Sequence, residues 1–180
     1  MTRATSPLQV RRASCHHSIS QATQASVRRL IPRLTPAALR RLIEQTTGTV
    51  QQIILDPEGE FRGISEAFGH TYIDGHKLDT AALAVVACRS REHRISLVVD
   101  ISDVDREGQM QAFAAMLGAL IEAPREHWHP CLVLVDEAHL FAPFGGQAGE
   151  SPAVRKASIS ALIDLMSRGR KRGLTGVLAT

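Results

Sequence analysis

Two adjacent carboxylates, Asp136 and Glu137, directly follow an unbroken apolar run over residues Cys131–Val135. Such a run is typical of a strand that is buried on both faces of a parallel sheet. Open α/β sheets place their ligands at the carboxyl ends of such strands, where one carboxylate can hold a hydrated Mg²⁺ and the next can polarise an attacking water. The pair therefore indicates chemistry on a metal-bound phosphate. The alternative is a strand end whose acids simply meet solvent.

This arrangement is that of a Walker B motif, which normally works with a glycine-rich loop that ends in lysine and a hydroxyl residue. The amides and the lysine of that loop hold the phosphates at the start of a helix. Here the segment before the helix predicted from Pro36 contains neither glycine nor lysine. Arg29 and Arg33 can attract phosphate, but side chains and Pro32 prevent the backbone from wrapping an anion. We expect binding of ATP and Mg²⁺ to be weak or absent.

A second charged feature is the basic run Arg168-Gly-Arg170-Lys-Arg172, which follows a predicted helix. Cations at a helix carboxyl terminus complement its dipole, so a solvated helix end is one interpretation. The functional alternative is an arginine that reaches a phosphate of a neighbouring subunit, or a contact with the DNA backbone. His127 and His129 share one polar loop, but two histidines without further ligands do not indicate a metal site.

Strands and helices alternate along the chain. Apolar runs predict strands, and residues recurring at helical spacing predict helices. Ile64–Phe68 suggests a single helical turn, and the glycines within Phe141–Ser151 predict a flexible loop. We therefore expect an α/β fold with a parallel sheet flanked by helices. The predicted strands are Val50–Leu55, Ile95–Ile101, Cys131–Val135 and Leu174–Thr180, and the predicted helices are Pro36–Thr47, Leu78–Cys88, Gln109–Glu122 and Ala153–Ser167.

Composition separates the chain into two parts. All 13 glycines fall at Gly48 or later, whereas the first quarter is rich in arginine. We expect residues 1–37 to be an atypical basic segment, disordered or foreign to the domain, and residues 38–180 to form the domain. The net charge of +3 does not by itself indicate nucleic acid. Unpaired cysteines and the lack of an apolar span predict a cytoplasmic protein without a membrane partner.

Three segments together, Ile54–Phe61, Leu134–His139 and Ser167–Thr180, resemble the HerA/FtsK-like ATPases, and the likeness is closest to the HerA-type branch. The resemblance covers about Ala38 to Thr180. It implies an incomplete RecA-like P-loop NTPase sheet, with ATP and Mg²⁺ as cofactors and DNA as a partner. It also implies a homo-hexamer or another ring ATPase partner, and an accompanying nuclease subunit.

The resemblance also assigns roles to particular residues. Asp136 and Glu137 match the catalytic Walker B pair, and Asp136 would bind Mg²⁺ of Mg-ATP through water. Arg168 or Arg170 falls in the basic segment before the sensor strand, and Thr180 lies at that strand's end near the nucleotide. No role follows for Asp56–Phe61.

The departures from the family matter more than the matches. The strand and glycine-rich loop that should precede about Ala38 have no counterpart, which a shifted reading frame or a rearranged gene would produce. That strand lies centrally in RecA-type sheets, so its absence is expected to leave neighbouring strands unpaired. We expect a fragment of a DNA translocase ATPase that is impaired in ATP binding and inactive alone. The alternatives are a non-catalytic subunit of a ring ATPase, or an active NTPase in which Arg29 or Arg33 replaces the lysine.

Overall fold

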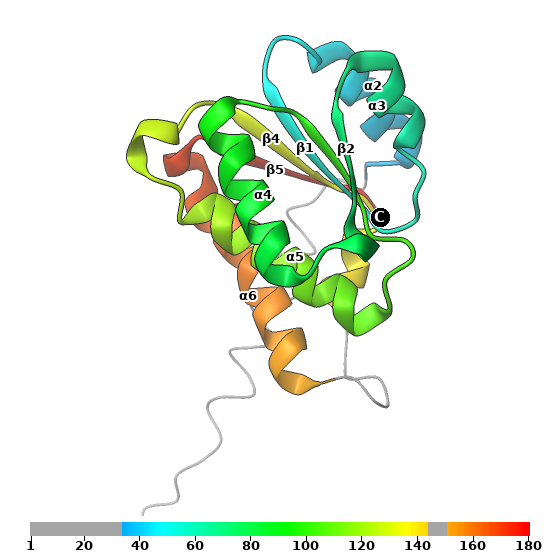
Figure 1. Ribbon diagram of the computed structural model, residues 1–180, viewed down its shortest axis with the longest axis vertical. Coiled ribbons are helices and arrows are strands. Elements are labelled where there is room, and N and C mark those ends of the chain that lie inside the picture. Colours follow the sequence, from blue (N-terminus) through cyan, green and yellow to red (C-terminus); the bar gives the residue numbers. More distant parts are fainter. Residues whose placement is uncertain (1–33, 144–150) are drawn as a thin grey trace, which may run out of the picture. The chain divides into compact units, whose positions relative to one another are not determined.

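The computed structural model describes residues 34–143 and 151–180. Five parallel strands form one sheet in the order β2-β3-β1-β4-β5. Helices flank the sheet, so the predicted α/β class with a parallel sheet is confirmed (Figure 1). The strands are β1 (Gln51–Asp56), β2 (Thr71–Asp74), β3 (Leu97–Asp100), β4 (Cys131–Val135) and β5 (Leu174–Leu178).

The helices cover the two faces of the sheet unequally (Figure 1). One face carries two of them, whose apolar side chains pack on the middle strands in a single core cluster. The other three pack side by side on the opposite face. The first group is α2 (Pro36–Thr46) and α3 (Arg62–Phe68), and the second is α4 (Thr80–His93), α5 (Arg106–Ile121) and α6 (Pro152–Arg168).

Helix α2 illustrates how local sequence sets an element. Thr35 caps its amino terminus, Pro36 occupies the first turn, and Gly48 follows its end with a φ of +78°. Leu39 and Ile43, spaced by four residues, are fully buried in the core cluster. Burial of each such side chain contributes about 1.5–3 kcal/mol, so packing rather than intrinsic propensity holds this short helix in place.

The sheet has one strand more than the sequence predicts. Strand β2 pairs in parallel with β3 and forms one edge of the sheet. Its four residues include Tyr72 and Ile73 but are at most partly buried. A short edge strand of this kind lacks the continuous apolar run by which the other strands were predicted.

The opposite edge belongs to β5. In the described part of the chain, β5 pairs with β4 on one side, and beyond it lies only an isolated parallel bridge between Leu34 and Ala179. The segment that enters α2 therefore begins beside the carboxyl end of β5. Strand β4 pairs directly with β5, so the expectation that a missing central strand leaves its neighbours unpaired is wrong for the described part of the sheet.

Two predicted segments fall largely outside the described residues. The basic segment 1–37 is described only from Leu34 onward. Residues 144–150 of the predicted flexible loop lie outside the described residues. At the start of that loop Phe141 is fully buried and stacks on Phe113, with ring centroids 4.1 Å apart. The first residue of the predicted loop is therefore part of the core.

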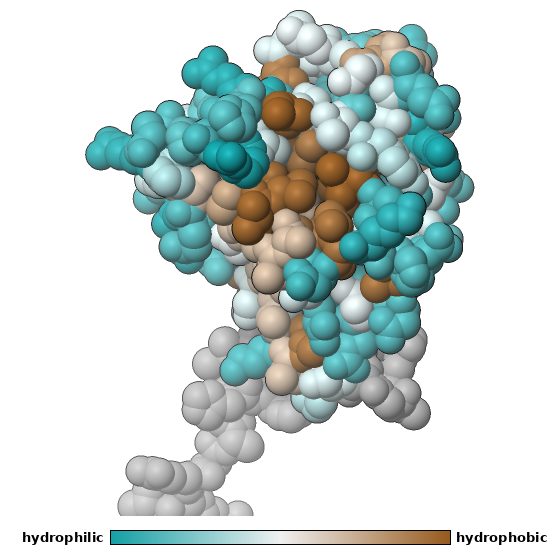
Figure 2. All heavy atoms as spheres, in the orientation of Figure 1, coloured by the Kyte–Doolittle hydropathy of each residue, from teal (hydrophilic) through white to brown (hydrophobic). Residues whose placement is uncertain are grey.

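Figure 2 shows that apolar residues gather on one face, in the region between α4 and the sheet edge formed by β2. The large apolar side chains that are exposed within the described ranges are Phe68, Val85, Ile95 and Met166. In those ranges, no helix has the length and apolar character that crossing a membrane requires.

Candidate functional site

Four adjacent strands end in an aspartate at the same edge of the sheet. Asp74, Asp100 and Asp56 are in register across β2, β3 and β1. Asp136 follows β4 directly, and its N–H donates to the carbonyl of Leu55 at 3.2 Å. Parallel strands bring their carboxyl ends to one edge, and this edge is where α/β proteins bind ligands. The predicted acid pair therefore lies where a ligand is expected.

Asp136 is almost completely buried, with 1% of its surface exposed. Its Oδ1 accepts a 2.9 Å hydrogen bond from the N–H of Glu137. Burial raises the pKa of Asp136, and the charges of Glu137, Asp56 and Glu60 raise it further, while the Glu137 amide lowers it. A buried carboxylate among other acids is stabilised by a cation, which is the property that a Mg²⁺-linked aspartate needs.

Glu137 adopts a left-handed backbone conformation with φ 44° and ψ 45°. Residues other than glycine rarely adopt this conformation, which costs of order 1 kcal/mol and is concentrated at functional sites. The Glu137 carboxylate lies 2.9 Å from Nδ1 of His139. The turn thus directs consecutive carboxylates differently, with Asp136 buried and Glu137 partly exposed beside an imidazole.

The segment after the acid pair is anchored to the helical layer. Arg106 donates to the carbonyl of Leu140, and the hydroxyl of Ser158 donates to the carbonyl of Phe141 at 2.7 Å. The stacking of Phe141 on Phe113 adds a buried aromatic contact. These contacts come from α5 and α6, so the position of the acid turn is fixed by two helices as well as by the sheet.

Asp56 has a structural role that the sequence did not suggest. Its carboxylate is fully buried and accepts hydrogen bonds from the N–H groups of Gly59, Glu60 and Phe61 at 2.8, 3.1 and 2.8 Å. It therefore closes the turn after β1. Burial raises its pKa, while these three amides lower it. Turn geometry therefore accounts for Asp56, and glycine at position 59, with a φ of +76°, fits the left-handed position there.

The amino terminus of α2 lies near the same edge. A pocket of about 200 Å³ is lined there by Pro36, Ala37, Arg40, Glu60 and Phe61. The charge of Glu60 also acts on Asp136, which places this pocket close to the acid pair. A helix amino terminus near such an edge of the sheet is a place where phosphate-binding folds hold an anion.

This helix terminus offers few amides to an anion. Pro36 has no N–H, the N–H of Ala38 donates to the Thr35 hydroxyl at 3.3 Å, and that of Leu39 donates to the Thr35 carbonyl. Of the described residues that line the pocket, Arg40 is the cation and Glu60 opposes it. The local amides are thus largely occupied, and the surrounding side chains are not strongly basic.

The structure brings some predicted site residues together and separates others. Thr180 directly follows Ala179, whose carbonyl accepts from the N–H of Ala138, so Thr180 lies at the edge of the acid pair. Arg168 and Arg170 precede β5 and lie at the amino edge of the sheet. The length of the strand separates them from Asp136 by roughly 15 Å. Within one chain they do not share a site with the acids.

The arginines of the basic run differ in exposure and in contacts. Arg168 is exposed and pairs with Asp164 at 3.2 Å, and Arg170 is exposed as well. Arg172 turns inward, donating to the carbonyl of Ile121 and lying 5.3 Å from the ring centroid of Trp128. Arg168 and Arg170 are therefore available at the surface, whereas Arg172 holds the loop before β4.

One histidine of the polar loop, His129, contacts the side chain of a glutamine. Nε2 of His129 lies 2.9 Å from Oε1 of Gln51. Among the residues that the structure describes, no group of three or more potential ligands is suited to a metal ion. Mg²⁺ held by one carboxylate, water and phosphate oxygens does not require such a group.

Comparisons with known proteins identify no relative: no family model matches the chain, and no curated protein or solved structure does.

Proposed function

We propose that the chain is a partial ATPase domain of the HerA/FtsK-like type that keeps a Walker B acid pair and is impaired in ATP binding. The observation that carries this proposal is the buried Asp136 and the left-handed Glu137 at the carboxyl end of β4, beside the amino terminus of α2. In an intact relative, Asp136 would hold Mg²⁺ through water and Glu137 would orient the attacking water. The proposed setting is the cytoplasm, with DNA as the partner of the parent activity.

The impairment follows from the other half of the site. An ATP-binding loop must surround the phosphates with free amides and neutralise them with a cation. Before α2 the sequence has Pro32 and neither glycine nor lysine, α2 itself begins with Pro36, and Thr35 occupies two of the first amides of the helix. The acids nearby would repel a triphosphate that arrives without enough positive charge. Mg²⁺ supplies electrostatic stabilisation only where the phosphates are already held.

Binding of a fluorescent ATP analogue to the purified chain tests this proposal. With Mg²⁺ present, we expect no saturable binding up to about 100 μM analogue, a range that covers ordinary nucleotide sites. Asp136→Ala serves as the control, because it removes the proposed Mg²⁺ contact. Saturable micromolar binding that is lost in Asp136→Ala would contradict the impairment and favour the active NTPase. In that case Arg29→Gln and Arg33→Gln would show which arginine replaces the lysine.

A second candidate function is that of a non-catalytic subunit in a ring ATPase. It is favoured by the exposure of Arg168 and Arg170 at the edge opposite Asp136, where they can reach a phosphate only on a neighbouring chain. Co-expression with a HerA-type ATPase from the same genome tests it. Co-purification, together with a loss of at least tenfold in the partner's stimulated ATPase rate for Arg168→Ala and Arg170→Ala combined, is the expected result. Lys171→Ala is the matched control at the same surface, and failure to co-purify would eliminate this candidate.

A further inference from the structure

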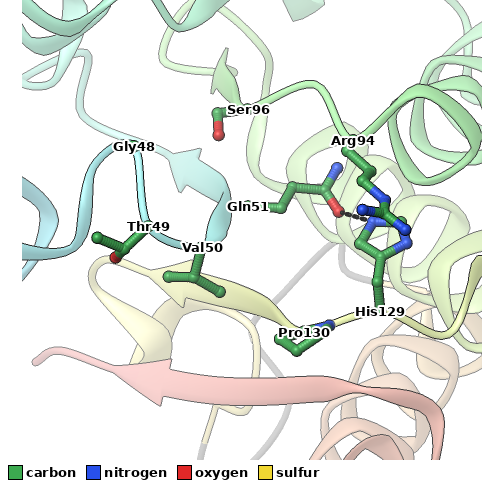
Figure 3. Close-up of a pocket in the computed structure, with 8 residues that line it drawn as sticks. All are labelled: Gly48, Thr49, Val50, Gln51, Arg94, Ser96, His129 and Pro130. Atoms are coloured by element: carbon green, nitrogen blue, oxygen red, sulfur yellow. Dashed lines mark hydrogen bonds between the residues drawn. The ribbon is translucent and has the colours of Figure 1, made fainter.

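A polar pocket of about 330 Å³ lies at the amino edge of the sheet, opposite the acid pair. Figure 3 shows that loops from three places in the sequence form it: the turn before β1, the turn between α4 and β3, and the segment that enters β4. Its size is at the lower end of the range for small-molecule sites. The lining residues are Gly48, Thr49, Val50, Gln51, Arg94, Ser96, His129 and Pro130.

The charge at this pocket is positive. Arg94 lines it, and no described lining residue is acidic. In Figure 3 the side chain of Arg94 lies next to the ring of His129. Among the described residues, no hydrogen bond or ion pair joins Arg94 to a carboxylate, which leaves its guanidinium available to an anion.

A second guanidinium lies behind the pocket wall. Arg91 is fully buried and donates to neutral acceptors: Oε1 of Gln51, the carbonyl of His129 and the carbonyl of Arg172, at 3.2, 3.0 and 3.1 Å. Its Nε has no hydrogen-bond partner in the described structure. A buried cation that is balanced only by dipoles produces a positive potential in its surroundings, since little solvent screens it.

The pKa of His129 is affected by both guanidinium groups. Burial and then the charges of Arg91 and Arg94 lower its pKa to about 4, so the ring is neutral near pH 7. The neutral ring lies 2.9 Å from Gln51, whose side-chain amide is fixed in turn by the carbonyls of Ser90 and Ile95. The wall of the pocket is therefore rigid, and its excess positive charge comes from the two arginines.

The hydroxyl groups of the pocket differ in what they can donate. The Thr49 hydroxyl already donates to the carbonyl of Thr46 at 2.7 Å. The Ser96 hydroxyl accepts from the N–H of Gln52 at 3.0 Å, which leaves its own hydrogen for a ligand. Figure 3 shows Ser96 and Arg94 on the same side of the pocket, with Val50 and Pro130 across from them. Donors on one side and apolar walls on the other suit a ligand with an anionic head and a small organic remainder.

We propose that this pocket binds the phosphate group of a small phosphate monoester, with Arg94 and Ser96 as donors and with the organic part against Val50 and Pro130. The planar guanidinium of arginine matches phosphate through paired hydrogen bonds. The site is independent of the acid pair, because it lies at the other edge of the sheet. A free metabolite and the 5′-phosphate end of a nucleic acid carry the same chemical group, and the experiment distinguishes them.

NMR titration of the folded chain with inorganic phosphate, observed at the imidazole of His129, tests the proposal. We expect saturable shifts and a rise in the pKa of His129 from about 4, because a bound anion offsets the two guanidinium charges. Arg94→Gln should weaken phosphate binding about tenfold or more through loss of a charge-assisted hydrogen bond. Arg89→Gln is the matched control, since Arg89 lies in the last part of α4, just before Arg94, but does not line the pocket and is exposed and paired with Glu92 at 3.0 Å.

Two outcomes would overturn the proposal: shifts that do not saturate, or equal binding by wild type and Arg94→Gln. Thermal unfolding of each variant shows whether it is folded, and Arg94→Lys, which keeps the charge, should retain more affinity than Arg94→Gln. A short oligonucleotide with and without a 5′-phosphate forms the second arm. Competition by the phosphorylated form alone assigns the site to nucleic acid ends, and competition by neither assigns it to free phosphate monoesters.

Discussion

Asp56 and Asp136 occupy equivalent positions at the ends of adjacent parallel strands, but the protein satisfies their carboxylates differently. Asp56 accepts three backbone hydrogen bonds, which close the turn after β1. Within the part of the chain that the structure describes, the carboxylate of Asp136 accepts one, from the N–H of Glu137. Both side chains are buried, so the difference in hydrogen bonding separates a structural carboxylate from one that is available for a ligand.

The first prediction concerns stability. Asp56→Asn should lower the free energy of unfolding by about 1–3 kcal/mol, because an amide cannot accept from all three N–H groups and leaves a buried group unsatisfied. Asp136→Asn should leave stability unchanged or raise it by up to about 1 kcal/mol, because it removes a buried charge that lies among other acids. Urea denaturation measures both values. A larger loss in Asp136→Asn than in Asp56→Asn would show that Asp136 is the structural residue.

The second prediction gives the pH dependence of that difference. The folded pKa of Asp136 is raised above the ordinary 3.8, so the folded protein keeps this proton to higher pH than the unfolded chain. The carboxyl therefore costs stability progressively as pH rises from about 3.8 through its folded pKa. Asn cannot titrate, so Asp136→Asn should gain relative to wild type across this interval and reach a plateau above it. Urea denaturation at pH about 3, 5 and 7 measures the difference, and a constant value would refute the raised pKa.

Much of the fold could be predicted because its central strands are continuous apolar runs. The ends of the helices were harder to predict from the sequence. Helix α4 was predicted to end at Cys88 but continues to His93, through polar residues that include the fully buried Arg91. The prediction followed the alanine-rich pattern of Leu78–Cys88, and the sequence cannot show that Arg91 finds acceptors on two distant loops. At its other end, the cap from Asp79 to the N–H of Ala82 sets the start of α4 at Thr80.

The third prediction uses the only tyrosine of the chain. The hydroxyl of Tyr72 donates to Oδ2 of Asp100 at 2.6 Å. That hydrogen bond, followed by burial, raises the pKa of Tyr72 to about 12. Absorbance titration of tyrosinate should give this midpoint in the folded protein, and a value near the ordinary 10.0 in urea.

Two variants identify the source of the Tyr72 shift. Asp100→Asn should return the midpoint toward 10.0, because it removes the charged acceptor. Ser102→Ala is the control: it removes a different hydrogen bond to Asp100, donated by the Ser102 hydroxyl at 2.7 Å, and leaves the Tyr72 contact in place. Equal shifts in the two variants would mean that the arrangement of the loop, rather than the hydrogen bond, controls Tyr72.

The candidate site was predictable in part for a physical reason. Asp136 and Glu137 were found because a buried strand must end at the sheet edge, and parallel strands share that edge. Arg168 and Arg170 precede β5. They are separated from the acids because β5 pairs in parallel with β4, so that the start of β5 and the end of β4 lie at opposite edges of the sheet. The amino-edge pocket joins Gly48, Arg94 and His129, which are far apart in the sequence and carry no common motif.

The last prediction compares two glycines with almost the same backbone conformation. Gly48 and Gly173 have φ values of +78° and +77°, so alanine at either position should cost about 1–2 kcal/mol for the left-handed conformation. A Cβ at Gly48 would meet nothing within 4 Å, whereas a Cβ at Gly173 would lie 2.5 Å from the carbonyl oxygen of His129. That atom belongs to backbone, which cannot move aside without shifting the loop that enters β4. Gly173→Ala should therefore lose about 1–3 kcal/mol more than Gly48→Ala in urea denaturation. Equal losses in the two variants would show that the backbone at Gly173 does not pack as closely on the backbone of His129 as the structure indicates.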